Sequence, residues 1–446
     1  MRIQYTLARS TGFPLPSLRA ALALAALLLL TVSPPAAGEN WQAWRGPRGD
    51  GTSKENDLPV SWNGKTGTNI AWKIPLPGTG HASPITWGDR IFTISTLEKS
   101  GERILLCLNR KDGSIRWQRK IFKAPLETIH RLNSRASSTP ATDGKLVFST
   151  FLKVDGRTVP APNVGSPRPI TPGTILVVAH DLDGNQKWKV EAGEFISAHG
   201  FNTCPVLYED LVIINGDHDG DAYIVALEKE TGKERWRIAR ENKTRSYVTP
   251  IIRKIGDRTQ MVLSGSKSVA SYNPANGKRH WIIDGPTEQF VASMVYDGRF
   301  LFITGGFPAR HILAIRPDGS GNVTDTHIAW RTNRGAAYVP SPIVAGPYFL
   351  IVSDNGIASC FEAENGKRLW MERLGGGHSA STVSAGGLVY FVSDKGVTTV
   401  VRPGKKFEVV AKNELGERCS ASPAISGGTI YIRGHKNLFA IKASGK

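Results

Sequence analysis

Three carboxylates stand at alternate positions in the segment Asp217-His218-Asp219-Gly220-Asp221. This spacing can offer oxygen ligands to a calcium ion. The segment is not an EF-hand loop, because Ala222 takes the place of the turn glycine and the flanking residues form predicted strands. Asp217, Asp219 and Asp221 are therefore candidate metal ligands, and the alternative is an acidic turn exposed to water.

A second candidate group consists of polar and aromatic side chains in loops that lead into predicted strands. On a ring of repeats these loops open on one face, where the side chains could bind a ligand or a partner. The group comprises His81, Arg131, Asn133, His199, Asn202, Arg245, Tyr247, Gln289, Phe290, Tyr338, His378 and Arg418. Its three arginines and three histidines meet almost no carboxylate, so an anionic ligand would fit. The alternative is that these side chains satisfy loop backbone groups around a watery channel.

The common hydrolytic motifs are missing. The sequence has no Gly-x-Ser-x-Gly and no His-Glu-x-x-His, so nucleophilic or zinc-dependent hydrolysis has no support. A mouth without paired carboxylates does not suit glycoside hydrolysis either. The four cysteines are far apart and form no adjacent pair and no Cys-x-x-Cys motif, so we expect four free, buried thiols.

The elements that must position these residues are marked by a glycine four residues before a tryptophan. The pairs are Gly113/Trp117, Gly184/Trp188, Gly232/Trp236, Gly277/Trp281 and Gly366/Trp370. Such recurrence, at intervals of about 40 to 70 residues, is the signature of a repeat architecture. Residues 226–236 form the best copy: a strand, a tight turn that needs a left-handed glycine, and a second strand. This pattern predicts the outer part of a β-propeller blade.

Each repeat also begins with a marker, a small residue that is usually followed by proline. The markers are Ser83-Pro84, Thr139-Pro140, Cys204-Pro205, Thr249-Pro250, Ser293-Met294, Ser341-Pro342, Ser381-Thr382 and Ser422-Pro423. Proline is tolerated at the start of an edge strand, which suits an innermost strand that faces a central channel. Eight markers predict eight four-stranded antiparallel blades. The alternative is a seven-bladed ring, in which the fourth or the seventh unit would be an addition outside the ring and not a blade.

The two ends of the chain are predicted to close the ring together. The chain ends on a third strand at 438–441, and an unassigned strand at 69–74 precedes the first repeat. We expect the early strand to become the outer strand of the last blade, which leaves no open sheet edge there. The sequence thus predicts an all-β, eight-bladed propeller over residues 69–446, preceded by a segment at 39–68 that wraps over the side of the ring.

The N-terminus has the features of a signal peptide. Three arginines precede an apolar run at 20–30, and small residues at 36–38 suit cleavage before Glu39. An uncleaved anchor is the alternative, although the run is short against the about 20 residues that span a bilayer. No later segment is long and apolar enough to span a membrane. We therefore expect a signal peptide at 1–38 and a periplasmic or secreted protein.

Charge and export together limit the partners. The chain carries a formal charge of +18, but export makes nucleic acid an unsuitable partner for this basic surface. We expect a monomer that binds an envelope protein or an anionic ligand. A proline-rich insertion at 151–174 opens on the mouth face and could act as a lid or docking arm; an ordinary long loop is the alternative.

The pattern Ala-x-(Asp/Glu)-x-x-(Thr/Asp)-Gly-x-x-x-Trp, complete at 226–236, resembles the tryptophan-docking repeat of the pyrroloquinoline quinone (PQQ) propeller family. The glycine and tryptophan also match in four other segments, 106–117, 178–188, 271–281 and 359–370. The family includes eight-bladed quinoprotein dehydrogenases and non-catalytic BamB-like envelope proteins. The resemblance implies the fold but leaves both functions open.

A dehydrogenase of this family would hold PQQ and calcium at the mouth, beside two adjacent cysteines and a stacked tryptophan. This chain has no Cys-Cys pair, no tryptophan among the candidate mouth residues and no Cys-x-x-Cys-His haem motif. These departures from the dehydrogenase pattern favour a non-catalytic binding or scaffold protein of the cell envelope, without a cofactor. The alternative is a PQQ-dependent dehydrogenase that oxidises alcohols or sugars.

Overall fold

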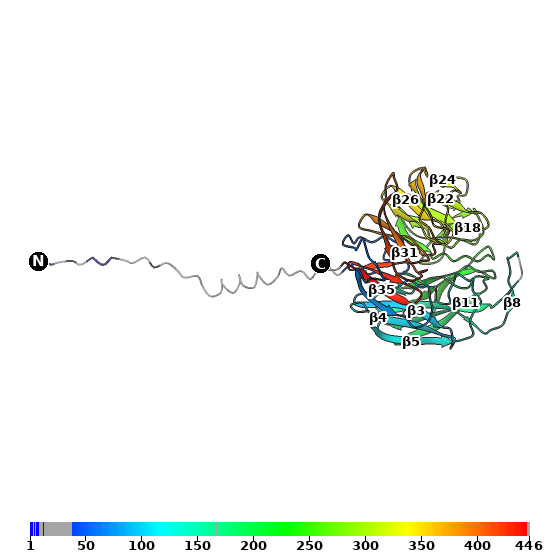
Figure 1. The fold of residues 1–446 in the computed structure, drawn as a ribbon, viewed down its shortest axis with the longest axis horizontal. Helices are drawn as coiled ribbons and strands as arrows, with labels where there is room; N and C mark the ends of the chain where they lie inside the picture. Colours follow the sequence, from blue (N-terminus) through cyan, green and yellow to red (C-terminus); the bar gives the residue numbers. More distant parts are fainter. Residues whose placement is uncertain (3, 5, 9–11, 13–37, 166–167, 444–446) are drawn as a thin grey trace. The chain divides into compact units, whose positions relative to one another are not determined.

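The structure, a computed structural model, describes residues 1, 2, 4, 6–8, 12, 38–165 and 168–443. The apolar run of the predicted signal peptide lies outside these residues. Within them the regular elements are β-strands, and eight sheets of four or five strands form a ring of blades (Figure 1). The predicted all-β, eight-bladed propeller is confirmed. The seven-bladed alternative is wrong, because the fourth and seventh blades are both complete.

The blades follow one another along the chain, and within each blade the strands succeed one another from the channel outward. Blade 1 contains β2 (Ile85–Trp87), β3 (Arg90–Leu97), β4 (Glu102–Asn109) and β5 (Ile115–Lys123); blade 2 contains β6 (Ala141–Thr142), β7 (Leu146–Val154), β10 (Gly173–Asp181) and β11 (Gln186–Phe195). Blade 3 contains β12 (Val206–Tyr208), β13 (Leu211–Gly216), β14 (Tyr223–Glu228) and β15 (Glu234–Ala239); blade 4 contains β16 (Ile251–Ile255), β17 (Arg258–Gly265), β18 (Ser268–Tyr272), β19 (Arg279–Asp284) and the short β23 (Gly321–Asn322). Blade 5 contains β20 (Val295–Tyr296), β21 (Leu301–Gly305), β22 (His311–Ile315) and β24 (Ile328–Thr332); blade 6 contains β25 (Ile343–Ala345), β26 (Tyr348–Val352), β27 (Ile357–Glu362) and β28 (Arg368–Arg373). Blade 7 contains β29 (Val383–Ala385), β30 (Leu388–Val392), β31 (Val397–Arg402) and β32 (Glu408–Glu414); blade 8 contains β33 (Ala424–Ser426), β34 (Thr429–Arg433), β35 (Asn437–Lys442) and β1 (Ile70–Pro75).

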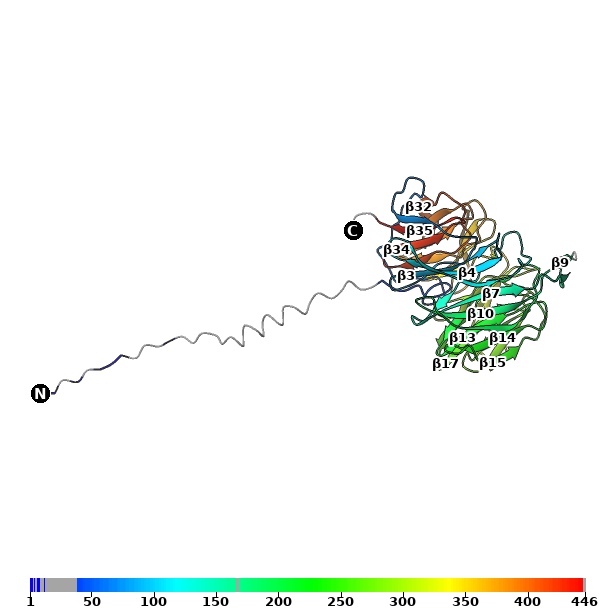
Figure 2. The same ribbon diagram turned by 90° about the horizontal axis from the view of Figure 1, so that it is seen from below.

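The ring closes through its two ends, as predicted. β1 pairs antiparallel with β35 and places Trp72 opposite Ala440. Both views show the C-terminal strands of blade 8 beside the first strands of blade 1 (Figures 1 and 2). Because β1 covers the edge of β35, the last blade does not present that edge to another chain.

The glycine–tryptophan spacing has a physical cause at the junction between blades. Gly232 has a φ of +72°, and a Cβ there would lie 2.7 Å from the ring of Trp188 in the preceding blade. The Trp188 indole donates to the carbonyl of Lys229 in the same turn at 2.7 Å. Glycine is therefore required both for the left-handed turn and for the close approach of the indole. Trp281 differs: it is buried and donates to Gln260 within its own blade.

The middle strands are buried on both faces because each blade packs between two neighbours. β3 and β4 each contain six consecutive buried residues, whereas the outer strand β15 alternates between exposed and half-buried positions. One core cluster joins blades 1 and 2 through Phe92, Val147 and Leu176. These continuous apolar runs explain why the second and third strands are easy to predict from sequence.

All four cysteines are buried and free in the structure, as predicted. Burial raises the pKa of the Cys107, Cys360 and Cys419 thiols to about 12. These three thiols are therefore protonated and unreactive at neutral pH.

Residues 39–68 run in two parts. The first part crosses the ring at the far end of the channel, where the backbone of Trp41 pairs with Thr86 on blade 1 and Gly51 pairs with Ser384 on blade 7. In the second part, Asn63 bridges to Glu414 at the outer edge of β32, and the indole of Trp62 stacks on Tyr390. The segment thus covers both the channel floor and one blade edge.

The insertion at 151–174 forms a hairpin in which β8 (Val159–Pro160) pairs with β9 (Pro169–Ile170). The hairpin projects from blade 2 away from the ring (Figures 1 and 2). Among the described residues we find no helix that is long and apolar enough to cross a membrane.

Candidate binding site in the central channel

The small residues that mark the start of each blade are linked by hydrogen bonds around part of the channel. The amides of five of the eight markers donate to the side chain of the next marker along the chain. The pairs are Ser83 with Thr139 (3.0 Å), Thr139 with Cys204 (3.2 Å), Ser293 with Ser341 (3.0 Å), Ser341 with Ser381 (3.0 Å) and Ser381 with Ser422 (2.8 Å). The marker is small and polar because it links two blades where the inner strands converge.

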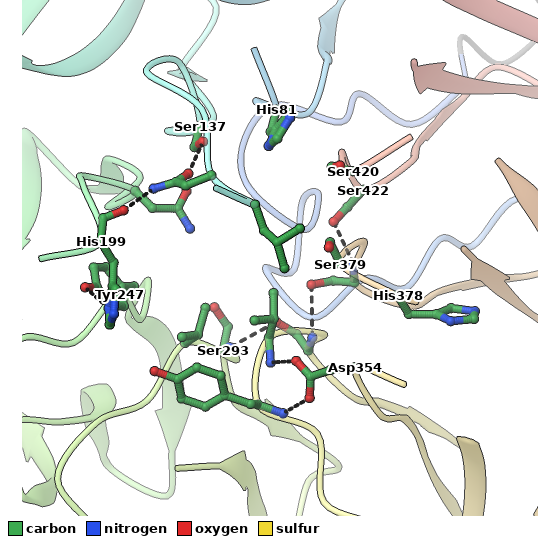
Figure 3. A pocket seen from close by; sticks show the side chains of 18 of the residues that line it. His81, Ser137, His199, Tyr247, Ser293, Asp354, His378, Ser379, Ser420 and Ser422 are labelled. Atoms are coloured by element: carbon green, nitrogen blue, oxygen red, sulfur yellow. Dashed lines mark hydrogen bonds between the residues drawn. The ribbon is translucent and has the colours of Figure 1, made fainter. Parts of the chain in front are cut away.

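A cavity of about 380 Å³ lies in the channel at this ring and opens towards the leading loops (Figure 3). Its lining residues are Trp44, His81, His130, Leu132, Asn133, Ser137, His199, Asn202, Cys204, Tyr247, Thr249, Val291, Ser293, Arg310, Tyr338, Val339, Ser341, Asp354, His378, Ser379, Ser381, Asp394, Ser420 and Ser422. The volume lies within the range of small-ligand sites.

Seven of the twelve sequence-selected mouth residues line this cavity. They are His81, Asn133, His199, Asn202, Tyr247, Tyr338 and His378. His199 and Tyr247 are joined, with Nδ1 and Oη 3.0 Å apart, and Tyr247 also contacts Ser197 Oγ at 2.7 Å. Figure 3 shows that the imidazole of His378 points away from the other lining side chains. His378 therefore lines the wall with its backbone and not with its imidazole.

The other five selected residues do not line the cavity. Arg131 and Arg418 are exposed outside it, while Gln289 and Phe290 are buried, at 1% and 0% exposure. Phe290 belongs to a hydrophobic core cluster, and Gln289 accepts a hydrogen bond from Tyr338. The side chains of these leading loops alternate between the channel and the protein interior, so only part of each loop can face a ligand.

Arg245 is the clearest departure from the predicted mouth. Its side chain is 2% exposed and forms an ion pair with Asp219, with Nη1 and Oδ2 2.8 Å apart. The same guanidinium donates to the carbonyls of Pro162 and Asn163 in the insertion hairpin. Arg245 therefore fastens the hairpin to blade 3 and is not free to bind an anion.

The three carboxylates of 217–221 do not gather around one point, so the predicted metal site is wrong. Asp217 pairs with Arg240 at 2.8 Å, Asp219 pairs with Arg245, and the exposed Asp221 pairs with Lys243 at 2.6 Å. Within the described ranges no three His, Cys, Asp or Glu side chains lie close enough to hold a metal ion. The segment is a loop between β13 and β14, in which each carboxylate is held by a different base.

His218 has a structural role between these carboxylates. It is fully buried, and its Nδ1 accepts the backbone amides of Ile196 at 3.2 Å and Gly220 at 3.0 Å. Burial lowers the pKa of His218, which keeps the ring neutral as these two hydrogen bonds require. The whole acidic segment thus shapes the blade 3 loop.

The cavity histidines are uncharged at neutral pH. Burial, reinforced by His435 and Arg433, lowers the pKa of His81 to about 3. Burial and the nearby Arg245 lower the pKa of His199 to about 4. These rings can exchange hydrogen bonds with a ligand but add no positive charge.

Two carboxylates, Asp354 and Asp394, line the cavity and were missed by the sequence analysis. They follow the second strands of blades 6 and 7, in the repeated pattern Ser-Asp-x-Gly at 353–356 and 393–396. Arg310 is the sole arginine or lysine among the lining residues and is exposed at the rim. The expectation of an anionic ligand depended on a mouth with an excess of positive side chains. The cavity has two carboxylates and neutral histidines instead, so it does not favour an anion.

The channel floor is supplied by the N-terminal segment. Trp44 lines the cavity, and its Nε1 donates to Ser293 Oγ at 3.1 Å. The candidate mouth residues include no tryptophan, and Trp44 reaches the cavity from the far end of the channel and not from a leading loop. Two apolar side chains of the leading-loop side are exposed: Leu132 (47%), which lines the cavity, and Phe307 (54%), which lies in the β21–β22 loop with the lining residue Arg310.

Comparisons with known proteins agree with the repeat pattern. A family model described as outer membrane protein assembly factor BamB matches residues 172–408, more than half of the chain. The outer membrane protein assembly factor BamB of Bordetella pertussis is 26% identical over 227 residues, which cover 48% of this chain and 55% of that protein. The chain thus spans about half the length of the curated relative it matches.

Solved structures share the fold at lower identity. The crystal structure of BamB from Moraxella catarrhalis aligns with a TM-score of 0.56 at 13% identity, covering 82% of this chain and 98% of that one. A europium-containing methanol dehydrogenase aligns with a TM-score of 0.60 at 13% identity, covering 93% and 92%. A quinohemoprotein alcohol dehydrogenase from Pseudomonas putida aligns with a TM-score of 0.58 at 12% identity, covering 91% and 81%. At these identities the likeness shows the propeller fold and not the activity.

Proposed function

Since the chain belongs to the family of the outer membrane protein assembly factor BamB, we propose that it is a non-catalytic binding or scaffold protein of the bacterial cell envelope. Its partner in this proposal is an envelope protein, as the description of the family suggests. The signal-peptide pattern at 1–38 supports a periplasmic or secreted location.

The observation that carries the proposal is the pair of apolar side chains at the open end of the cavity. Leu132, which lines the cavity, and Phe307, in the same loop as the lining residue Arg310, are about half exposed, and the cavity is lined by aromatic and hydroxyl groups. Exposed apolar residues beside a polar, concave surface are typical of a protein-binding site. A partner loop would cover both side chains when it enters the cavity.

The residues of the cavity do not suit the PQQ and calcium of the dehydrogenase branch. Calcium needs six to eight oxygen ligands, yet both oxygens of Asp354 accept backbone amides, those of Tyr338 at 2.8 Å and Val339 at 2.9 Å, which leaves Asp394 as the one lining carboxylate without a donor among the described residues. Cys204 has no second cysteine beside it, and the Trp44 indole is tied to Ser293. We therefore propose that the protein works without either group.

A capture experiment with matched variants tests the proposed function. The tagged mature chain would be incubated with envelope extract, beside a mouth variant that combines Leu132→Ser and Phe307→Ser. The control combines Ile115→Ser and Met371→Ser on outer strands, where the side chains are 43% and 46% exposed. We expect the mouth variant to lose a partner that the parent and the control retain. Retention by all three, or PQQ-dependent oxidation of an alcohol or sugar by the purified chain, would contradict the proposal.

A further inference from the structure

Asp394 is a carboxylate on the cavity wall that has no partner. Its Oδ1 is buried and accepts no hydrogen bond, and its side chain forms no ion pair within 4.0 Å among the described residues. A carboxylate oxygen without water or a donor is costly to bury. The residue as a whole is half-buried and lines the cavity, so a donor that enters the cavity would reach the carboxylate at its other oxygen, Oδ2.

The equivalent carboxylate in the neighbouring blade shows why Asp394 is left free. Asp354 lies 40 residues earlier in the same Ser-Asp-x-Gly turn, and it accepts the amides of its own leading loop at 338 and 339 (Figure 3). In blade 7 the corresponding amide, that of His378, donates instead to the carbonyl of Asp354 at 3.0 Å. Asp394 thereby loses the donor that its position in the repeat would supply.

No positive group of the cavity compensates the charge of Asp394. The pKa of His378 is lowered by burial despite the opposing effect of Asp394, and His81 and His199 are neutral. Arg310 lies at the rim, exposed to water that screens its charge. The centre of the cavity therefore favours a cation.

The other walls suit an alkyl chain that ends in a cation. Trp44, Tyr338 and Val339 offer aromatic and apolar surface, and Ser420 and Ser422 offer hydroxyl acceptors. Aromatic faces attract cations, and carboxylates bind ammonium and guanidinium groups through charge-assisted hydrogen bonds. Because the N-terminal segment forms the floor, a ligand must enter and leave by the mouth.

We propose that the cavity receives a lysine or arginine side chain of the partner protein, with the cationic head on Asp394. The inference rests on the proposed function, because that function assigns Leu132 and Phe307, on the loops of the same face, to contacts with the partner. The partner would therefore present a loop with a basic residue between apolar residues. The basic side chain would enter the cavity, and the apolar side chains would cover Leu132 and Phe307.

Calorimetric titration with short peptides tests this inference on the mature chain. The probes are a capped pentapeptide with a central lysine between leucines, the same peptide with norleucine or acetyl-lysine in place of the lysine, and free n-butylammonium. We expect the lysine peptide to bind at least tenfold more tightly than the two uncharged peptides and than the free amine. Equal affinities for the lysine and norleucine peptides would overturn the inference, and equal affinity for the free amine would overturn it in favour of a small-amine site.

Two variants separate this inference from the proposed function. Asp394→Asn should weaken the lysine peptide at least tenfold, whereas Asp257→Asn, the same charge change at an exposed turn of blade 4, should leave it unchanged. Each variant would also be used to capture the envelope partner. If Asp394→Asn captures it as well as the parent while the mouth variant does not, the lysine site is wrong and the proposed function stands. If the mouth variant also captures the partner, the proposed function fails.

Discussion

Asp219 and Arg245 form an ion pair, 2.8 Å between Oδ2 and Nη1, in which both side chains are buried. This single contact removes a candidate metal ligand and a candidate anion-binding arginine from the functional surface. It also attaches the insertion hairpin to the ring, because the remaining guanidinium hydrogens reach the carbonyls of residues 162 and 163.

Arg245→Ala should destabilise the fold, because it leaves Asp219 as an uncompensated buried charge. Removing one partner of a buried pair costs about 3 to 5 kcal/mol. Arg418→Ala, at an exposed position, should stay within about 0.5 kcal/mol of the parent. Urea unfolding of both variants measures the difference, and equal stabilities would show that the pair does not form.

Blades 6 and 7 offer a matched comparison of two carboxylates. Asp354→Ala leaves the amides of Tyr338 and Val339 without their acceptor, at a cost of about 1 to 3 kcal/mol for each buried unsatisfied group. Asp394→Ala removes a carboxylate whose buried Oδ1 accepts no hydrogen bond. The free energy of unfolding of this variant should therefore not fall below that of the parent protein. Thermal melts of the two variants check this order, and a reversed order would contradict the hydrogen bonding described for the two turns.

Closure of the ring predicts a large effect from a small deletion. A chain that lacks residues 39–76 has no β1, so the edge of β35 is exposed and the packing of Trp72 on Tyr431 is lost. Trp72 is half-buried, but the deletion also removes the buried Trp41 and Trp62, and loss of one buried large aromatic costs about 3 to 5 kcal/mol. The shortened chain should melt far below the mature one or aggregate; melting within a few degrees of it would rule out the closure.

The cavity histidines predict a loss of stability in acid. The pKa of His81 is about 3 in the fold against about 6.5 when unfolded, so the unfolded chain binds the additional proton. Stability should therefore fall as the pH drops from 6.5 towards 3, by up to about 2 kcal/mol at pH 5 from this one residue. Unfolding of His81→Gln at pH 7 and pH 5 should show a smaller fall than the parent, and an identical fall would mean that His81 is not kept neutral.

Calcium should not stabilise the protein, because Asp217, Asp219 and Asp221 each bind a different base. Melting curves of the purified chain with millimolar calcium and with a chelator should superimpose. A rise of several degrees with calcium would show that a cation site exists in the chain after all.

The fold could be predicted from sequence because its signals recur. The Gly–Trp spacing reflects an indole that packs on the turn of the next blade, and the small markers reflect hydrogen bonds between inner strands. Each of these constraints is local and repeats in most blades. After the other strands are assigned to blades, the edge of the last blade is the one predicted strand edge without a partner, and the strand at 69–74 pairs there.

The site was only partly predictable, because side-chain direction within a loop is set by tertiary contacts. Tyr247 faces the cavity while Arg245, two residues earlier, turns inward to Asp219. Trp44 reaches the cavity from a segment without any repeat signal. Asp354 and Asp394 could have been found, since the Ser-Asp-x-Gly pattern recurs at an interval of 40 residues in turns that face the mouth.

The most direct test of the binding function is a photo-crosslink from the mouth of the full chain in living cells. A photoreactive amino acid would replace Leu132 on the rim in one variant and Ile115 on an outer strand in another; both positions have similar exposure. We predict a crosslink to a discrete envelope protein from position 132 and none from position 115. No crosslink from position 132, or the same crosslinks from both positions, would contradict a partner-binding mouth.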